Sequence, residues 1–125
     1  MGEVVVYNTE LAWCAGFFDG EGTTSYLKKD NWIGPRMSVA QNNVVPLERF
    51  QKAVGYGKIY AHTTRLGMFQ WTCQRKDDVK IVLDKLWPFL CEQKKEQALS
   101  IFKMVADNQA ERQSIKDKES SLCGS

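Results

Sequence analysis

The sequence has little of the chemistry that zinc sites need, because it holds one histidine and four cysteines without a CxxC pair. These absences exclude a zinc cluster with the usual ligand spacing, and they favour reduced intracellular thiols at Cys14, Cys73, Cys91 and Cys123. Long apolar runs are also missing, and none approaches the roughly 18 residues of a membrane-spanning helix. Met1–Glu10 has no basic start followed by an apolar segment, so we expect neither a secretory signal nor a membrane partner.

The net charge of the chain is small, but basic residues are concentrated in its middle. The 125 residues carry a net charge of +2. Residues 23–76 hold nine basic and two acidic residues, a net of +7, and the rest of the chain carries −5. A basic middle suits a face that binds a polyanion, although a merely solvated surface has the same composition.

The most distinctive stretch is Cys14–Gly22, an apolar segment that ends in two acidic residues between glycines. As a helix it places three small residues in one stripe that allows another backbone to approach closely: Ala12, Gly16 and Gly20. Asp19 and Glu21 then lie at the helix C-terminus, where negative charge costs about 0.3–1 kcal/mol per residue. A sequence that tolerates this cost is expected to bind a cation there.

Hydrophobic periodicity and turn residues predict helix, hairpin, helix, hairpin, helix, helix. We expect helices at Thr9–Gly20, Pro46–Val54, Lys76–Leu86 and Gln93–Asp107, and strands at Gly22–Lys29, Arg36–Gln41, Lys58–His62 and Met68–Gln74. This order predicts an α+β fold in which one four-stranded antiparallel sheet is covered by helices on one face. We expect one domain at residues 1–109 and a polar, fraying C-terminal tail at residues 110–125.

Alternation along the predicted strands separates an apolar set from a polar set. The apolar set, expected to face the helices, is Met37, Val39, Ile59, Ala61, Phe69, Trp71 and Cys73. The polar set faces outward and offers side chains that can hydrogen-bond base edges and phosphates, although a solvated sheet looks similar. It comprises Arg36, Ser38, Lys58, Tyr60, His62, Gln70, Thr72 and Gln74. The phase of residues 22–29 stays open, so Lys28 and Lys29 are both candidates for binding DNA.

At this point the chain resembles a known family. Cys14–Gly22 is similar to the LAGLIDADG motif, with Cys14 for the first Leu, Phe17-Phe18 for Leu-Ile, Gly20 for the second Ala and Glu21 for the last Asp. The element order resembles the αββαββα core of LAGLIDADG homing endonucleases between Leu11 and Val105. Two further landmarks agree in order: Val39-Ala40-Gln41 at the end of a strand, and Lys94-Lys95-Glu96-Gln97-Ala98 near the start of a late helix.

The resemblance implies an active site built on three residues. Glu21 corresponds to the metal-binding carboxylate, and the carbonyl of Gly20 is a further possible ligand of Mg²⁺ or another divalent cation such as Mn²⁺. Gln41 corresponds to a residue that arranges water, and Lys94 to the active-site lysine, although Lys95 or Gln93 is an alternative. Each residue also has an interpretation without a catalytic role: Glu21 as a solvent-facing acid, Gln41 as an amide at the end of a strand and Lys94 as a surface lysine.

One motif per chain implies a homodimer, because two-motif relatives are pseudo-symmetric monomers. Its interface would comprise Ala12, Gly16, Asp19 and Gly20, with Asp19 in a structural role and two sheets forming a DNA-binding saddle. Such a protein is a site-specific endonuclease that uses a divalent metal to hydrolyse one phosphodiester per strand of a long, near-palindromic site. We expect an intracellular location, in an organelle or in bacterial or phage-infected cytoplasm.

Besides the nuclease, two alternatives remain at this stage. One is a non-cleaving LAGLIDADG protein, such as an intron-splicing maturase or a DNA-binding regulator. An unrelated, metal-free dimerisation module would also explain the glycine stripe, but it leaves the basic middle unexplained.

Overall fold

The computed structural model describes the backbone of residues 8–123 and the side chains of residues 8–118. The elements are α1 (Asn8–Glu21), β1 (Gly22–Lys29), β2 (Trp32–Gln41), α2 (Val44–Val54), β3 (Lys58–Ala61), β4 (Phe69–Cys73), α3 (Lys76–Leu86), the 3-10 turn η1 (Trp87–Phe89) and α4 (Glu92–Cys123). The strands form one antiparallel sheet, which confirms the predicted fold class and element order. None of the described helices is both long and apolar enough to cross a membrane.

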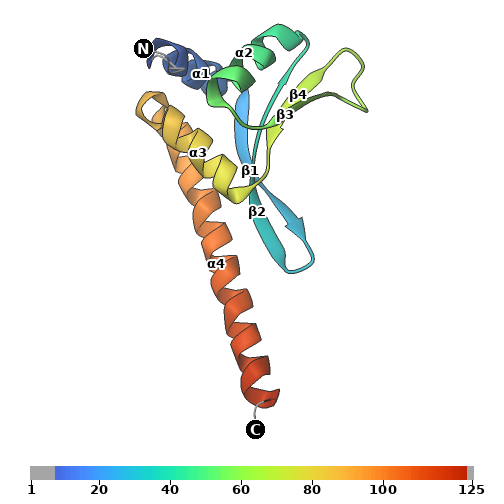
Figure 1. Cartoon of the computed structure of the whole chain (residues 1–125), viewed down its shortest axis with the longest axis vertical. Coiled ribbons are helices and arrows are strands. Elements are labelled where there is room, and N and C mark those ends of the chain that lie inside the picture. The colour runs from blue at the N-terminus through green and yellow to red at the C-terminus, as the bar shows by residue number, and fades with distance from the viewer. Residues whose placement is uncertain (1–7, 124–125) are drawn as a thin grey trace, which may run out of the picture.

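The sheet has the strand order β1-β2-β4-β3, so that β1 and β3 are its edges. Helix α2 packs against β2, β3 and β4, and α3 packs against β2. Helix α4 runs along β1 and β2 and projects beyond their hairpin (Figure 1). The predicted turn at Asp30-Asn31 joins these two strands, and Asp30 takes a left-handed φ of 56° there.

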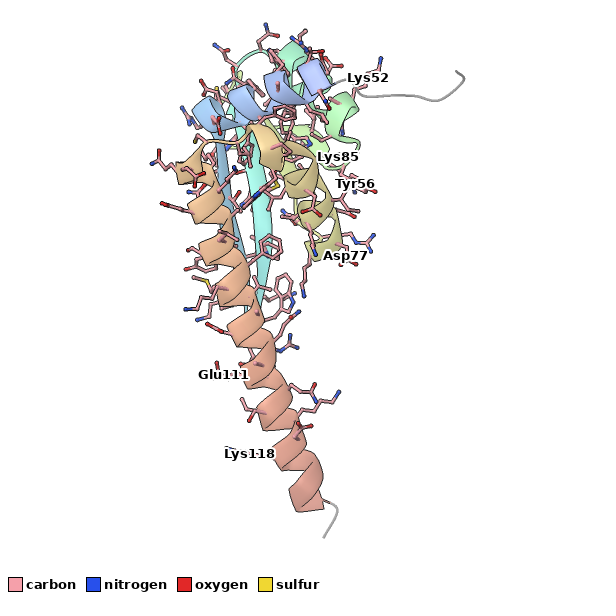
Figure 2. The ribbon with its side chains drawn as sticks, turned by 90° about the vertical axis from the view of Figure 1, so that its left-hand side faces the viewer. Lys52, Tyr56, Asp77, Lys85, Glu111 and Lys118 are labelled. Carbon is pink, nitrogen blue, oxygen red and sulfur yellow. The ribbon has the colours of Figure 1, made fainter. Side chains whose placement is uncertain are left out.

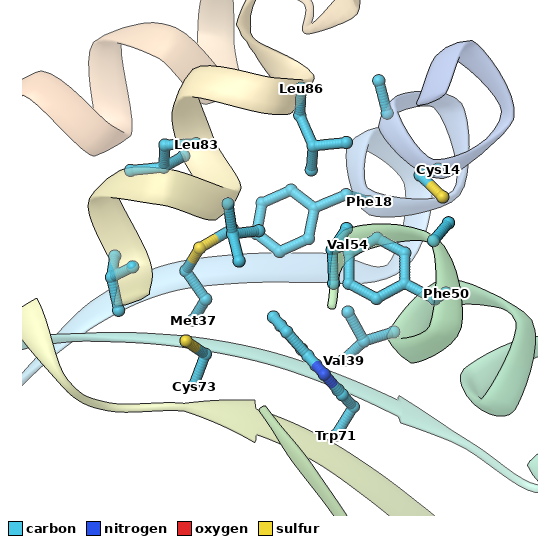
Figure 3. Packing of buried hydrophobic residues seen from close by; sticks show 14 of the residues in the cluster. Cys14, Phe18, Met37, Val39, Phe50, Val54, Trp71, Cys73, Leu83 and Leu86 are labelled. Carbon is cyan, nitrogen blue, oxygen red and sulfur yellow. The ribbon is translucent and has the colours of Figure 1, made fainter. Parts of the chain in front are cut away.

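An aromatic stack joins α1, α2 and the sheet in the centre of the core. The ring of Phe50 lies 6.3 Å from that of Phe18 and 4.8 Å from that of Trp71, both measured between centroids. All three side chains are fully buried between the helices and the sheet, beside Met37 and Val39 of β2 (Figure 3). Trp71 Nε1 also donates to the Tyr56 carbonyl at 2.9 Å, which satisfies its polar atom in the core. The stack fixes how α1 lies on the sheet.

Helix α2 begins at Val44, two residues before the predicted start at Pro46. The Asn43 side chain accepts a hydrogen bond from Val45 N at 3.0 Å and so caps the helix. Proline is tolerated at the third helical position because that N–H has no partner within the helix. The predicted end at Gly55 is confirmed, with a left-handed φ of 82°.

The C-terminus of α2 is held by α3. Lys85 Nζ donates to the Val54 carbonyl at 2.9 Å and lies 5.6 Å from the centroid of the Tyr56 ring. Figure 2 shows Lys85 and Tyr56 next to each other on this side of the molecule. A cation at a helix C-terminus also interacts favourably with the helix dipole.

Two predicted boundaries differ from the structure by four residues or more. Strand β2 begins at Trp32 rather than Arg36, because Trp32–Pro35 pairs with Tyr26–Lys29 across the hairpin. Helix α4 continues to Cys123 instead of ending at Asp107. Residues 108–123 contain no glycine or proline and many good helix formers, which explains the longer helix. The side chains of residues 109–118 are nevertheless exposed, as expected of a polar tail.

The thiols of Cys14 and Cys73 are free and buried, and that of Cys91 is free and exposed. Burial raises the pKa of Cys14 to about 12 and the pKa of Cys73 to about 11, because the core disfavours the thiolate. Both are therefore neutral packing groups at physiological pH. The side chain of Cys123 lies outside the described residues.

Candidate metal and nucleic-acid site

The candidate metal ligand Glu21 lies at the junction between the first helix and the first strand. It is the last residue of α1, its side chain is exposed, and β1 begins at the next residue, Gly22. A Cβ atom at Gly22 would overlap the ring of Phe18, so glycine is required where the chain turns from helix to strand. With no loop residue in between, the orientation of Glu21 depends directly on how the start of β1 is held.

Two side chains of α4 hold that start. Lys94 Nζ donates to the Gly22 carbonyl at 2.6 Å, and the Gln97 Oε1 atom accepts a hydrogen bond from Thr24 N at 3.1 Å. Residues three apart on a helix share a face, so both side chains reach the same strand. Because β1 is an edge strand, the backbone groups on its outer side have no neighbouring strand to pair with. The side chains of Lys94 and Gln97 supply hydrogen bonds to two of these groups.

The structure separates the three candidates for the active-site lysine position. Lys94 lies beside the residue that follows Glu21. Lys95 points elsewhere, with Nζ 3.8 Å from a carboxylate oxygen of Glu92 and 5.7 Å from the centroid of the Trp87 ring. Gln93 is exposed. The geometry therefore favours Lys94 over its neighbours, while its catalytic role stays a prediction.

The predicted interface residue Asp19 makes a contact within its own chain. Its Oδ1 atom accepts a hydrogen bond from Cys91 N at 3.2 Å, which ties the end of α1 to the residue before α4. A structural role for this acid agrees with that bond. Its proximity to a second copy stays a prediction.

Gln41 lies at the same end of the sheet as Glu21. It is the last residue of β2, and Val39, two residues earlier, pairs with Gly22. Its side chain is half-buried. The register places Gln41 near Glu21, and the hydrogen bond to Gly22 places Lys94 there too, although the three residues are far apart in the sequence.

The donors present fit an incomplete divalent-cation site. Among the described residues, no cluster of three or more His, Cys, Asp or Glu side chains is placed to hold a metal. Glu21 supplies one exposed carboxylate, and Gly20 lies among the last residues of α1, whose carbonyls lack helical partners. Mg²⁺ commonly takes one or two protein carboxylates and completes its shell with water and phosphate. These donors therefore fit a site that another copy and a phosphate would complete.

Strand register defines which side chains face away from the helices. Residues paired across antiparallel strands share a face. Thr72 pairs with Ser38 and Lys58, and Gln70 pairs with Tyr60. Together with the partners on β1 and the rest of β2, the outward face carries Thr23, Ser25, Leu27, Lys29, Trp32, Arg36, Ser38, Lys58, Tyr60, Gln70 and Thr72.

The register also resolves the phase that the sequence left open. Lys29 pairs with Trp32 on the outward face, whereas Lys28 pairs with Ile33 and shares the face that carries Met37. Lys28 therefore does not share the outward face with the other candidate DNA-binding residues of the strands. Its side chain is exposed, but it lies on the side where α4 packs. Thr23, Ser25 and Leu27 join the outward face with Lys29.

Several predicted contact residues are less accessible than alternation suggested. Thr72 is only 7% exposed, because its short side chain lies on an inner strand between those of Ser38 and Lys58. His62 follows the end of β3, is half-buried, and has Nδ1 3.2 Å from Thr64 Oγ1. Gln74 lies just beyond β4 and is exposed. The Arg36 Nε atom is buried without a hydrogen-bond partner in the part of the chain that is described.

The small-residue stripe of α1 is open to solvent. Ala12, Gly16 and Gly20 are exposed, and a Cβ atom added at either glycine meets no described atom within 4 Å. This open surface agrees with the predicted interface, and the dimer itself stays a prediction.

Sequence reasoning missed Gln97 as a residue of this site. The available signal was its spacing, because it lies three residues after Lys94 on the same helix. Its contact depends on the position of α4 along β1, which the sequence pattern does not specify.

The profile of the LAGLIDADG endonuclease family matches residues 14–106, which hold the Glu21 junction, the sheet and the first half of α4. The chain belongs to the LAGLIDADG endonuclease family. This match confirms the resemblance drawn from Cys14–Gly22 and the two later landmarks.

Solved structures of homing endonucleases share the fold. The homing endonuclease I-CvuI, bound to the I-CreI target with Mg and uncleaved DNA, is 22% identical with a TM-score of 0.62, over 74% of this chain and 64% of its own. The archaeal intron-encoded I-Vdi141I, complexed with DNA, is 17% identical with a TM-score of 0.64, over 79% and 68%. The group I intron-encoded I-CeuI, also complexed with DNA, is 19% identical with a TM-score of 0.62, over 86% and 56%. The chain thus spans less than two thirds of I-CvuI and of I-CeuI.

Proposed function

We propose that this LAGLIDADG chain forms a homodimeric, site-specific endonuclease that hydrolyses one phosphodiester in each strand of a long, near-palindromic DNA site. The observation that carries the proposal is the junction of Glu21 and Gly22, held by Lys94 at 2.6 Å and continuous with the polar face of the sheet. One acidic and one basic group thereby lie where the sheet face begins. This arrangement suits a phosphodiester that lies across the end of α1.

The chain's own residues would contribute to hydrolysis in different ways. Glu21 would hold the divalent cation, with the Gly20 carbonyl as a further donor, and the two-fold axis would bring a second Glu21 nearby. The bound ion would polarise the phosphate and lower the pKa of water. Lys94 would add positive charge next to the phosphate oxygens. The Gln41 amide, which can both donate and accept hydrogen bonds, would orient water.

The outward face of the sheet would bind the DNA. It combines basic residues with hydroxyl and amide groups, as base and phosphate recognition requires: Lys29, Arg36, Ser38, Lys58, Tyr60, Gln70 and, beyond the strands, His62 and Gln74. The net charge of +7 over residues 23–76 would favour association with duplex DNA. Two copies would read two half-sites related by the two-fold axis.

Replacing the candidate metal ligand tests the proposal. A random duplex library is first selected for binding, and selected sites are then incubated with the protein in Mg²⁺ or in EDTA. We expect cleavage in Mg²⁺ by wild type and a loss of at least about a hundredfold with Glu21→Gln, because the amide removes the anionic ligand. Glu111→Gln is the matched control, since this glutamate projects from the exposed part of α4 (Figure 2).

The outcomes separate the candidate functions. Cleavage that survives Glu21→Gln contradicts the metal-ligand role. Specific binding without cleavage by the wild type contradicts the nuclease proposal and favours a non-cleaving maturase or DNA-binding regulator of the same family.

A further inference from the structure

We infer that Gln97 is a positioning residue for the Glu21 site, a role that rests on the proposed nuclease function. It makes no hydrogen bond to Glu21 in the described part of the chain. Its side chain instead accepts the backbone N–H of Thr24, three residues after Glu21, at 3.1 Å. Through this bond the amide holds the strand that continues directly from the metal-ligand residue.

The geometry makes this bond one of two anchors on a short segment. Lys94 holds the Gly22 carbonyl and Gln97 holds the Thr24 N–H, so the first three residues of β1 are fixed to α4 at two points. With one anchor, an edge strand can pivot about it. With two, the direction in which the chain leaves Glu21 is determined.

The same bond also positions Lys94. Lys94 and Gln97 lie one helical turn apart on α4, so the Thr24 contact sets the place of this turn along β1. Gly22 has no side chain that could anchor it by packing, and the ring of Phe18 lies against it on the core side. A small displacement of α4 would therefore move the lysine and the carboxylate relative to each other. Groups that hydrogen-bond directly to metal ligands typically contribute 10–100-fold to activity or metal affinity, and because Gln97 acts through the backbone of Thr24 we expect an effect of about tenfold.

The test compares variants that keep or remove the acceptor. Gln97→Met keeps the length of the side chain and removes the acceptor, whereas Gln97→Glu keeps an acceptor oxygen. Gln113→Met is the matched control, because it removes another glutamine hydrogen bond of α4, to Asp117 at 3.0 Å, far from β1. All variants are assayed on a selected site, well below their unfolding temperatures.

Two measurements are made. Amide hydrogen exchange reports on the Thr24 N–H in the protein without DNA or metal. Single-turnover cleavage in Mg²⁺ at saturating DNA, with DNA affinity measured in Ca²⁺, separates turnover from binding. For Gln97→Met we expect Thr24 exchange to be faster and cleavage to be slower, each by about tenfold or more, with DNA affinity changed by less than about twofold. Gln97→Glu should recover most of both losses, and Gln113→Met should match wild type.

Three results would overturn the inference. The first is a Thr24 exchange rate that is unchanged in Gln97→Met. The second is an unchanged cleavage rate at saturating DNA while the wild type cleaves. The third is a weaker DNA affinity that accounts for the whole loss of activity, which would show a role in packing or binding instead. A wild type that cleaves no selected site overturns the proposed function, and the failure is then visible before any variant is compared.

Discussion

Two neighbouring threonines at the start of β1 differ in the surroundings of their hydroxyl groups. Thr24 is 2% exposed, and its Oγ1 atom has no hydrogen-bond partner among the residues described. Thr23 is exposed on the outward face. A buried hydroxyl without a partner costs free energy, typically about 1–3 kcal/mol. The N–H of Thr24 donates a favourable hydrogen bond to Gln97, whereas the buried hydroxyl group of Thr24 is unfavourable.

Replacing Thr24 by valine should therefore stabilise the fold. Valine keeps the shape and the backbone N–H while removing the unpaired hydroxyl, so we expect the free energy of unfolding to rise by about 1 kcal/mol. Denaturant titration of the wild type and Thr24→Val measures the change. Thr23→Val, the control on the solvent side, should alter stability by less than about 0.5 kcal/mol. A less stable Thr24→Val would show that the hydroxyl does have a partner.

At the scale of elements, the β1–β2 hairpin places two adjacent lysines on opposite faces. Lys29 shares the outward face with the polar residues, and Lys28 shares the other face with Ile33. Side chains alternate between faces along a strand, so neighbours in sequence differ completely in what they can reach. The hairpin thus offers a matched pair for testing which face binds DNA.

Lys29→Ala should weaken binding to duplex DNA, and Lys28→Ala should not. Each phosphate contact contributes about 0.9 to the slope of log K against log salt, so Lys29→Ala should lower the magnitude of that slope by about 0.9. Fluorescence anisotropy at several salt concentrations measures both variants. Equal slopes for the two variants would exclude the outward face of this hairpin as the phosphate-binding surface.

The boundaries of elements show where local sequence was sufficient. The end of α2 at Gly55 follows from the tolerance of glycine for positive φ, and that prediction is confirmed. The start of β2 was predicted four residues late, because Pro35 and Gly34 interrupt the alternation while pairing with β1 still extends the strand. Helix α4 was predicted too short, because its polar second half has no apolar periodicity to mark it as helix.

At the scale of the whole molecule, the proposed function requires two copies. One chain contributes a single exposed carboxylate at Glu21, and the stripe of Ala12, Gly16 and Gly20 is open on the same helix. A two-fold contact along this stripe would bring the two Glu21 residues together. Trp13, the residue after Ala12, is half-buried, and the guanidinium carbon of the exposed Arg49 lies 3.7 Å from the centroid of its ring.

A bulky residue in the stripe should dissociate the dimer without unfolding the chain. A Cβ atom at Gly16 meets no described atom within 4 Å, so Gly16→Leu should fold, but its side chain would hold two α1 helices apart. Sedimentation should give a dimer for the wild type and a monomer for Gly16→Leu. Ala110→Leu, at another exposed helical position on α4, should remain dimeric. A monomeric wild type, with and without DNA, would contradict the interface.

The sequence by itself determined the element order, the sheet and the candidate acid Glu21, because apolar periodicity, turn residues and the acid-ended glycine motif are local features. The candidates Gln41 and Lys94 came from the resemblance of the sequence to the LAGLIDADG family. The tertiary structure decided the rest. Lys94 rather than Lys95 contacts the residue after Glu21, Lys28 and Lys29 lie on opposite faces, and Gln97 holds Thr24. These relations depend on how α4 lies along an edge strand and on strand register. The position of α4 is set by packing between segments more than 70 residues apart, at Lys94 and Gly22 among others, and the register is set by backbone pairing between β1 and β2.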